Sequence, residues 1–297
     1  MTILLDTHGG DHAPHEVIKG ARLAEQKLGV SIVLVDGDQL PMDADPTGIL
    51  KQYKDSSMAV GLRMLAEGRG DAFVSAGNTG ALLVGATIWV KRVRGVRRPC
   101  IAAILPTATS PVVLLDCGAN ADCTAEMLDG FAQLGSVYAK SALGLNNPRV
   151  GLINNGTEEI KGDKLRQETH ALLRENAHIN FVGNMEAREI PAGGCDVAVT
   201  DGFTGNVVLK LYEGMGAMMK QQLVSRFAWN PLAWPSLLGL RKQLDYKNHG
   251  GAPLLGLRGV VIKAHGSSDA AAVYHAIRQA KACVENGMVD IMKGAFS

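Results

Sequence analysis

The sequence lacks the motifs that most often identify nucleotide-binding and hydrolytic enzymes. Neither GxGxxG after the first predicted strand nor GxxxxGK[ST] is present, which argues against hydride transfer and against a P-loop. HExxH and GxSxG are also absent, so a zinc protease site and a serine-hydrolase elbow have no support. The five cysteines form no CxxC pair and no zinc-ligand spacing, and we expect no metal site.

Aromatic residues, long apolar runs and net charge are also scarce. Aromatic residues make up 5% of the chain, and no run of about 18 apolar residues predicts a membrane-spanning helix. The net charge is +1, which gives no general attraction for nucleic acid, and no nucleic-acid partner is expected. The sequence starts directly with a predicted strand and shows no signal peptide, so we expect a cytoplasmic protein.

Five short segments rich in glycine and small polar residues each follow a brief apolar run. They are DTHGGD (6–11), SAGNTG (75–80), DCGANAD (116–122), DGFTGN (201–206) and HGSSD (265–269), called the five turns below. An apolar run too short for a helix and closed by glycine is typical of a buried parallel strand. Glycine there lets backbone N–H groups approach a ligand. We therefore expect all five turns to gather at one carboxyl edge and hold an anion or small polar group.

Hydrophobic periodicity predicts alternating strands and helices along the 297 residues. Strands are predicted at 3–5, 31–35, 72–75, 101–105, 112–116, 149–153, 180–182 and 197–201, the fourth and fifth as a candidate hairpin. Helices are predicted at 15–28, 56–67, 80–90, 125–142, 164–176, 206–223 and 270–285. This alternation predicts one α/β domain over 1–297, a mainly parallel sheet with helices on both faces.

Two segments fall outside that pattern. The basic stretch 91–98 (KRVRGVRR) is either a solvated helix end and loop or a docking patch for an acidic partner. The segment 226–241 carries two of the three tryptophans and two prolines, which suits a subunit interface, a core contact or an exposed tip at a membrane surface. The tip residues would be Trp229, Leu232, Trp234 and Leu237.

The polar side chains of the turns are amides, hydroxyls and carboxylates, with few strong nucleophiles. Such a set suits a site that positions two reactants and stabilises an oxyanion without a covalent enzyme intermediate. Each residue alone is also typical of a helix cap or turn. Lys161, in the loop after a predicted strand, could hold phosphate as a point charge or be an ordinary surface lysine.

Several long blocks, in order, resemble the PlsX family of bacterial phosphate acyltransferases. The blocks are GGDHAP (9–14), KDSSM (54–58), DAFVSAGNTGALL (71–83), LLDCGANADC (114–123), INFVGNMEAR (179–188), TDGFTGNVVLK (200–210) and GGAPLLGLRGVVIKAHGSS (250–268). The resemblance covers nearly the whole chain. It implies a phosphotransacetylase/isopropylmalate dehydrogenase-like αβα fold, a homodimer, peripheral contact with the inner face of the cell membrane, and no organic cofactor. It also implies that inorganic phosphate attacks the acyl thioester of acyl carrier protein, giving acyl phosphate for phospholipid synthesis.

The matching motifs imply a set of site residues. Lys161 would hold phosphate or stabilise the thioester oxyanion, and Asn206 would donate a hydrogen bond to the same charge. Residues implied to bind phosphate or substrate are Asp6, Gly9, Gly10, Ser75, Asn78, Thr79, Gly80, Asn120, Asp201, Thr204, Gly205 and His265. The basic stretch becomes a candidate docking surface for the acidic carrier protein through Arg92, Arg94, Arg97 and Arg98. Residues 207–249 match the family's protruding hydrophobic helical arm.

The sequence departs from the family pattern at two places. Thr7 and His8 make the first turn more polar, and the stretch 37–53 is shorter than in the family, which puts acyl preference in doubt. Two other functions stay open at this point. One is phosphotransacetylase-like exchange with acyl-coenzyme A, and the other is a non-catalytic paralogue that binds the carrier protein or the membrane.

Overall fold

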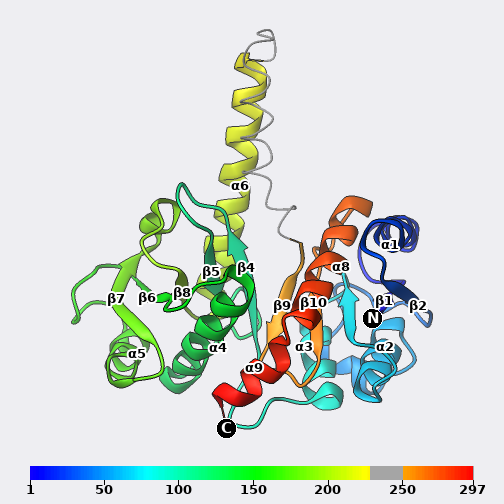
Figure 1. The fold of residues 1–297 in the computed structure, drawn as a ribbon, viewed down its shortest axis with the longest axis horizontal. Helices are drawn as coiled ribbons and strands as arrows, with labels where there is room; N and C mark the ends of the chain where they lie inside the picture. The colour runs from blue at the N-terminus through cyan, green and yellow to red at the C-terminus, as the bar shows by residue number, and fades with distance from the viewer. Residues whose placement is uncertain (228–249, 297) are drawn as a thin grey trace.

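The computed structural model describes residues 1–227 and 250–296. A ten-stranded sheet runs through the molecule in the order β2-β1-β3-β10-β9-β4-β5-β8-β6-β7 (Figure 1). The strands are β1 (Thr2–Asp6), β2 (Ser31–Val35), β3 (Ala72–Ser75), β4 (Cys100–Leu105), β5 (Val112–Leu115), β6 (Arg149–Asn154), β7 (Asn180–Glu186), β8 (Val197–Val199), β9 (Ala252–Leu255) and β10 (Val260–Lys263). The eight predicted strands are all present, and the predicted hairpin is the antiparallel pair β4–β5.

Two parallel halves of the sheet run in opposite directions. The strands β2, β1, β3 and β10 form the first half, and β5, β8, β6 and β7 form the second. Between them β9 and β4 pair antiparallel with each other and with their outer neighbours. The carboxyl ends of the two halves therefore lie at opposite edges of the sheet. The expectation that all five turns gather at one edge is wrong, because the hairpin reverses the strand direction.

Helices cover both faces of the sheet, as predicted. They are α1 (His15–Leu28), α2 (Ser57–Ala66), α3 (Thr79–Gly85), α4 (Ala125–Leu143), α5 (Lys164–Glu175), α6 (Gly202–Phe227), α8 (Ala270–Glu285) and α9 (Met288–Ala295), with short helices η1 (Pro46–Leu50), η2 (Ala86–Val90, a π-helix) and η3 (Ala187–Ala192). Ile3 and Leu5 join the buried core under α1, α4 and α8, whereas Leu4 joins the core under α2 and α3. Successive strand side chains point to opposite faces, so one strand serves both cores.

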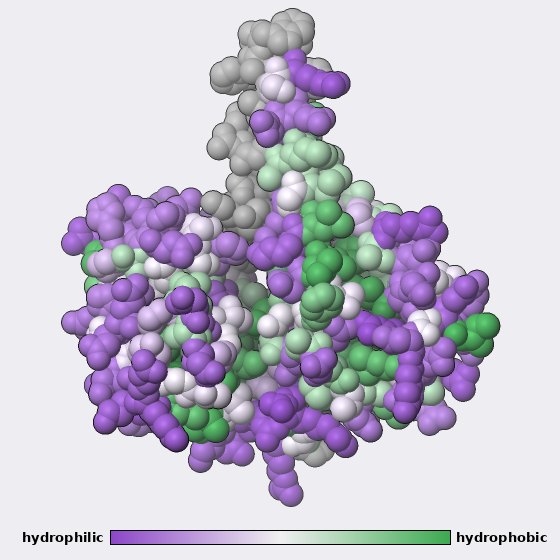
Figure 2. Space-filling view, turned by 180° about the vertical axis from the view of Figure 1, so that it is seen from behind, coloured by the Kyte–Doolittle hydropathy of each residue, from purple (hydrophilic) through white to green (hydrophobic). Residues whose placement is uncertain are grey.

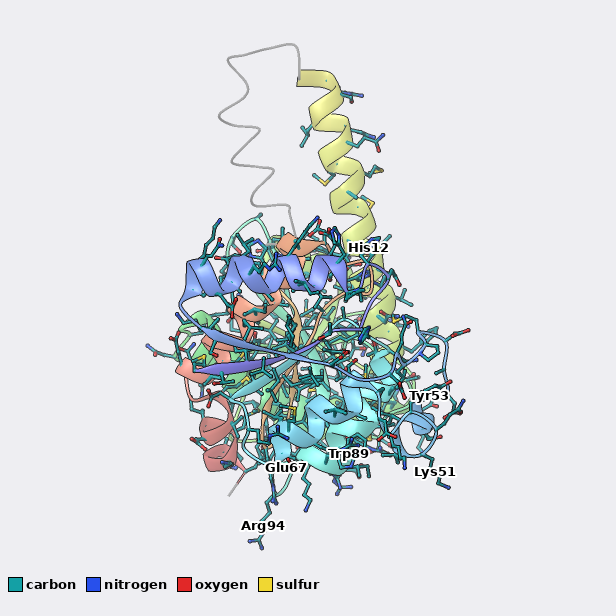
Figure 3. The ribbon with its side chains drawn as sticks, turned by 90° about the vertical axis from the view of Figure 1, so that its right-hand side faces the viewer. His12, Lys51, Tyr53, Glu67, Trp89 and Arg94 are labelled. Carbon is teal, nitrogen blue, oxygen red and sulfur yellow. The ribbon has the colours of Figure 1, made fainter. Side chains whose placement is uncertain are left out.

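Helix α6 begins in tight contact with the turn after β5. A Cβ atom added to Gly205 would lie 1.9 Å from the carbonyl oxygen of Asp116, and the N–H of Gly202 donates to the carbonyl of Asn120 at 2.7 Å. Glycine is therefore required for this approach of backbone to backbone. From this base α6 leaves the body of the molecule (Figures 1 and 3). Apolar side chains are visible along it in Figure 2.

Several features were not predicted. Strand β9 and helix α9 were missed, and the predicted helix 80–90 changes to a π-helix at Ala86. No helix within residues 1–227 and 250–296 has the length and apolar character to span a membrane. The predicted tip residues Trp229, Leu232, Trp234 and Leu237 lie outside the described residues.

Replacement of Gly205 by alanine tests the close contact at the base of α6. The new methyl group would overlap the Asp116 carbonyl, so we expect Gly205→Ala to lower the free energy of unfolding by about 3 kcal/mol in urea titrations. Gly214→Ala is the matched control on the same helix, because nothing lies within 4 Å of its added Cβ. It should raise stability by about 0.5–1 kcal/mol. Equal changes in the free energy of unfolding in both variants would contradict the close contact between Gly205 and Asp116.

Candidate active site

Three of the five turns meet at one edge of the first half of the sheet. Gly10 has φ +101°, and a Cβ on it would lie 2.9 Å from the carbonyl oxygen of Gly266 and 3.0 Å from the Cβ of Ala76. The N–H of Asp11 donates to the same Gly266 carbonyl at 2.8 Å. We call residues 6–11, 75–80 and 264–268 the first turn cluster. Only glycine combines this positive φ with such close neighbours.

A buried carboxylate holds the first turn cluster together. Ser57 and Ser75 donate their hydroxyls to Oδ1 and Oδ2 of Asp6, each at 2.5 Å. A Cβ on Gly9 would lie 2.4 Å from the same Oδ2. Burial raises the pKa of the Asp6 carboxyl above its ordinary value. Asp6 and Ser75, predicted to bind substrate, therefore fix the ends of β1 and β3 beneath the site.

The second turn anchors the shortened stretch 37–53. Asn78 caps α3 by accepting from the N–H of Ala81 at 2.9 Å, and its amide donates to the carbonyls of Met42 and Ala44. A Cβ on Gly80 would lie 2.6 Å from Pro46. The Asn78 side chain is thus occupied by the protein itself, while the neighbouring Thr79 lines a cavity.

The other two turns, residues 116–122 and 201–206, form a second turn cluster at the opposite edge. Buried Asp116 accepts from the N–H groups of Ile101, Ala119 and Asn120, and the Asn120 amide donates to Asp116 and to the carbonyl of Pro99. The Asn120 amide therefore supports the turn, and its role in binding substrate stays a prediction.

Arg166 of α5 clamps the start of α6, a role that was not predicted from the sequence. Its guanidinium pairs with Asp201 and donates to Thr204 Oγ1 at 3.0 Å. Asp201 in turn accepts from the N–H of Thr204 at 2.9 Å, capping α6. Burial acts to raise the pKa of Asp201, but the Thr204 hydrogen bonds and the Arg166 charge together lower it. The carboxylate stays ionised and holds the helix that carries Asn206.

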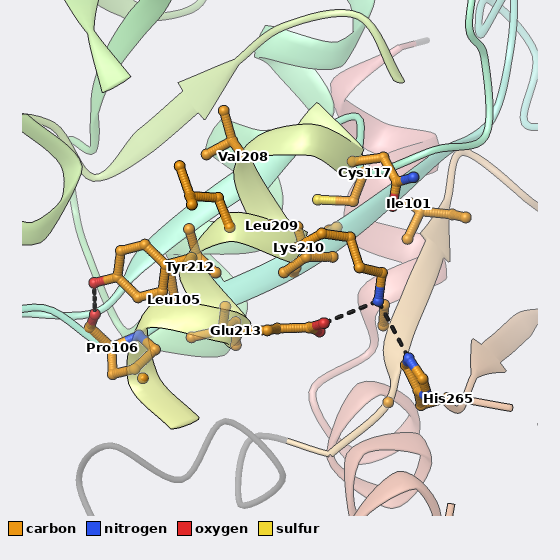
Figure 4. A pocket seen from close by; sticks show the side chains of 18 of the residues that line it. Ile101, Leu105, Pro106, Cys117, Val208, Leu209, Lys210, Tyr212, Glu213 and His265 are labelled. Carbon is orange, nitrogen blue, oxygen red and sulfur yellow. Dashed lines mark hydrogen bonds and ion pairs between the residues drawn. The ribbon is translucent and has the colours of Figure 1, made fainter. Parts of the chain in front are cut away.

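One cavity of about 1000 Å³ lies between the two turn clusters, and each of the five turns contributes a residue to its lining. These five residues are Asp11, Thr79, Cys117, Asn206 and His265. Figure 4 shows Cys117 and His265 of this lining from close by. Apolar residues of β4 and α6 form much of the remaining wall, among them Ile101, Leu105, Val208, Leu209 and Met215. The turns therefore contribute to one site, although from two sheet edges.

Asn206 is the free amide of this cavity. Its side chain makes no hydrogen bond to another residue in 1–227 or 250–296, and Gly118, with φ +123°, lies beside it. Cys117 also lines the cavity, but burial raises the pKa of its thiol well above the ordinary range. A thiol that stays protonated is a poor nucleophile. In this part of the cavity, the Asn206 amide can therefore donate a hydrogen bond to a negatively charged reactant. Cys117 does not supply a thiolate nucleophile.

Two lysines and a histidine lie at the end of the same cavity that is next to the first turn cluster (Figure 4). Lys210 Nζ lies 2.8 Å from Glu213 Oε2 and 3.1 Å from His265 Nε2. Lys263 donates to the carbonyl of Ala76 at 3.3 Å, and burial lowers the pKa of this lysine to about 8. Burial, followed by the Lys210 charge, lowers the pKa of His265. Both lysines were missed, although Lys210 follows Asn206 by one helical turn and Lys263 ends an apolar strand.

Lys161 and the basic stretch lie outside this cavity. Lys161 is exposed in the loop after β6, its carbonyl accepting from the Asn154 amide at 3.1 Å. Arg92, Arg94, Arg97 and Arg98 are all exposed. Arg94 projects from the body at the end opposite the free end of α6 (Figure 3). Across the part of the chain that is described, no group of three or more His, Cys, Asp or Glu residues could hold a metal.

Comparison with known proteins identifies relatives along the whole chain. Residues 34–291 match the family model described as "Fatty acid synthesis protein". A protein of Desulforamulus reducens named "Phosphate acyltransferase" is 44% identical over 322 residues, covering 99% of this chain and 96% of the relative. Another of that name, from Desulfitobacterium hafniense (strain Y51), is 41% identical over 324 residues, covering 99% and 96%.

Solved structures show the same fold. A phosphotransacetylase from Streptococcus pyogenes superposes with a TM-score of 0.63 at 16% identity, over 96% of this chain and 94% of the other. A branched-chain phosphotransacylase from Enterococcus faecalis V583 gives 0.62 at 15%, over 96% and 99%. The predicted α/β fold class is thus confirmed. With 40% or more identity to curated relatives along nearly its full length, this chain belongs to the fatty acid synthesis protein family, the family of the bacterial phosphate acyltransferases.

Proposed function

We propose that this chain, a phosphate acyltransferase by family membership, takes its acyl group from acyl carrier protein and delivers it to inorganic phosphate. The acyl phosphate would feed phospholipid synthesis. The observation that carries the proposal is the single cavity that joins an apolar wall to a free amide and two lysines. An acyl thioester and phosphate need these two kinds of surface side by side. No cofactor is required for the reaction.

The apolar wall suits the hydrocarbon part of the donor. At about 1000 Å³ the cavity is at the upper end of the size range of ligand pockets, roughly 300–1,000 Å³. Leu105, Val208 and Leu209 lie along it (Figure 4). Met42 of the stretch 37–53 also lines the cavity. We therefore expect the length of that stretch to influence which acyl chains the enzyme accepts.

Asn206 would stabilise the thioester oxyanion. Its amide is free, and the Arg166–Asp201 pair fixes the start of its helix. A preorganised donor of this kind acts on the charge that develops during attack. We propose Lys161 as a second catalytic residue, as the matching motif implies: its loop follows β6, which pairs parallel with β8, the strand that leads into α6 and Asn206.

Substitution of the two catalytic candidates tests the assignment. Asn206→Ala should lower kcat by about 100-fold, the effect of removing one oxyanion donor, and Lys161→Ala by a similar factor. Lys164→Ala is the control, because Lys164 is also an exposed lysine and is close in the sequence. The assay is phosphate-dependent release of the carrier thiol. A kcat within threefold of the wild type in Asn206→Ala would refute its role.

The acyl carrier protein is proposed as donor because of the exposed basic stretch 91–98. None of its four arginines pairs with a carboxylate among the described residues, so their charges are available to an acidic partner. Complementary charges of this kind govern docking and its salt dependence. Acyl-coenzyme A, which has no protein surface to dock, would not use them.

Charge reversal in that stretch separates the two donors. Arg94→Glu should raise KM for acyl-acyl carrier protein by about tenfold and leave KM for acyl-coenzyme A unchanged. Lys140→Glu, on the exposed end of α4, provides the same change of net charge away from the stretch. An equal effect of Arg94→Glu on both donors would instead favour phosphotransacetylase-like exchange.

Helix α6 offers an apolar surface for a second copy of the chain. Its exposed residues at helical spacing are Phe203, Val207, Leu211, Met215 and Met218, with exposed fractions between 44% and 68%. Figure 2 shows the apolar patches along this helix. Such a row of exposed apolar side chains on a protein surface indicates an interaction site. We infer a homodimer through the stripe, and peripheral contact of the cytoplasmic protein with the inner face of the membrane through Trp229 and Trp234.

Two variants of the arm should have reciprocal effects. Leu211→Glu should halve the mass measured by light scattering and leave sedimentation with anionic vesicles intact. Trp234→Glu should reduce vesicle sedimentation and leave the mass unchanged, because tryptophan favours the membrane interface. Each variant is thus the control for the other. An unchanged mass in the first, or unchanged vesicle binding in the second, would refute the corresponding contact.

A further inference from the structure

Two lysines and a histidine form a polar end to the otherwise apolar cavity. Lys210 comes from α6, whereas Lys263 and His265 come from the end of β10 and the turn after it. Lys210 Nζ lies 3.1 Å from His265 Nε2, so the two elements meet here (Figure 4). His265 is held by Ser267, whose hydroxyl lies 2.9 Å from Nδ1.

Lys263 is the unusual member of this group. Its ammonium donates to the backbone carbonyls of Ala76 and Ala264 and forms no ion pair with a carboxylate in residues 1–227 or 250–296. An ammonium has three donors, so one is left for the cavity. A half-buried ammonium without a counter-ion carries a desolvation cost that a bound anion would offset. The cavity that Lys263 lines supplies space for that anion.

We propose that Lys210 and Lys263 bind the phosphate that attacks the thioester, with His265 and Glu213 positioning Lys210. This inference rests on the proposed function and assigns the phosphate site within it. Two ammonium groups on facing elements can each donate hydrogen bonds to the oxygens of one hydrogen phosphate. The dianion is also the nucleophilic form of the substrate.

The spacing on α6 places the two reactants next to each other. Asn206 and Lys210 are four residues apart on one helix and both line the cavity. Side chains at this spacing have Cβ atoms about 5–6 Å apart. A thioester whose carbonyl oxygen is held by Asn206 and a phosphate held by Lys210 would therefore be neighbours in the cavity, as attack on the carbonyl carbon requires.

Transfer of the acyl group from the thioester to phosphate needs no co-reactant. A phosphate oxygen forms a bond to the thioester carbonyl carbon, which gives an oxyanion. The C–S bond breaks as this oxyanion collapses and re-forms the carbonyl. The electron pair leaves on the carrier sulfur, which takes up the proton of hydrogen phosphate directly or through solvent. The products are acyl phosphate dianion and free thiol, with charge conserved.

Phosphate affinity should depend on the charge of Lys263. The charged or titratable groups around it and its neighbours are Asp6, Asp11, Lys210, Glu213 and His265. With a pKa of about 8, Lys263 holds its charge below that pH and loses it above. Phosphate binding requires the charged form, so binding weakens as pH rises from 7 to 9. The protonated fraction of a group with this pKa falls by about tenfold over that range.

The direct test is calorimetric titration of the full chain with inorganic phosphate, without an acyl donor. We expect Lys210→Gln and Lys263→Met each to raise Kd for phosphate at least tenfold, and Lys210→Arg to retain most of the affinity. Lys293→Gln, a half-exposed lysine on α9 that pairs with Asp290, removes one charge elsewhere and should stay within twofold. The wild-type Kd, expressed for the hydrogen phosphate dianion, should rise about tenfold between pH 7 and 9, and Lys263→Met should lose this dependence.

Kinetics distinguish the attacking phosphate from the phosphate of the donor's pantetheine arm. The variants should raise KM for phosphate at least tenfold and leave KM for the acyl donor within twofold. A raised donor KM with unchanged phosphate affinity, together with weaker binding of 4′-phosphopantetheine, would overturn the assignment. If Lys263→Met does not fold, Lys210→Gln alone decides. If the wild-type chain binds phosphate but does not turn over an acyl donor, the proposed function is refuted, whereas the assignment of the phosphate site is not.

Discussion

The reversal of strand direction at β4 and β9 is the constraint on which the site depends. It sends the carboxyl ends of the two halves to opposite edges of the sheet, so the polar turns form two clusters instead of one. Helix α6 then joins them, because it starts in the second cluster against Asp116 and reaches His265 of the first through Lys210. A cavity that spans the middle of the sheet follows from this arrangement.

The buried polar groups divide into two kinds. Asp6 and Asp116 accept hydrogen bonds from the protein, the amide of Asn120 donates to Asp116, and these groups hold strand ends and turns in place. Their burial would be costly without those partners. Asn206 and Lys263 keep donors that the described residues do not satisfy, and both line the cavity. A rigid support with a few free donors is the arrangement that stabilises charge during a reaction.

The sequence predicted the strands, the hairpin and the helices well, because short apolar runs and helical periodicity are local signals. It predicted that all turns share an edge, and this failed even though the hairpin was foreseen. The consequence of the hairpin appears only when β9 is inserted between β10 and β4, and β9 was missed. Among the predicted site residues, Asn206, Thr79 and His265 line the cavity, and their roles in catalysis and binding stay predictions. Arg166 could not be found, since its partners Asp201 and Thr204 are distant in the chain. The role of Lys161 stays a prediction.

The central claim is that thioester and phosphate meet in the one cavity between the two turn clusters. A crystal structure with phosphate and a non-reactive acyl-thioester analogue tests this directly. We predict the analogue's carbonyl oxygen within hydrogen-bond distance of the Asn206 amide, its hydrocarbon chain against Leu105 and Val208, and the phosphate beside Lys210 and Lys263. Density for both ligands outside this cavity, in a crystal that turns over acyl substrate, would contradict the claim.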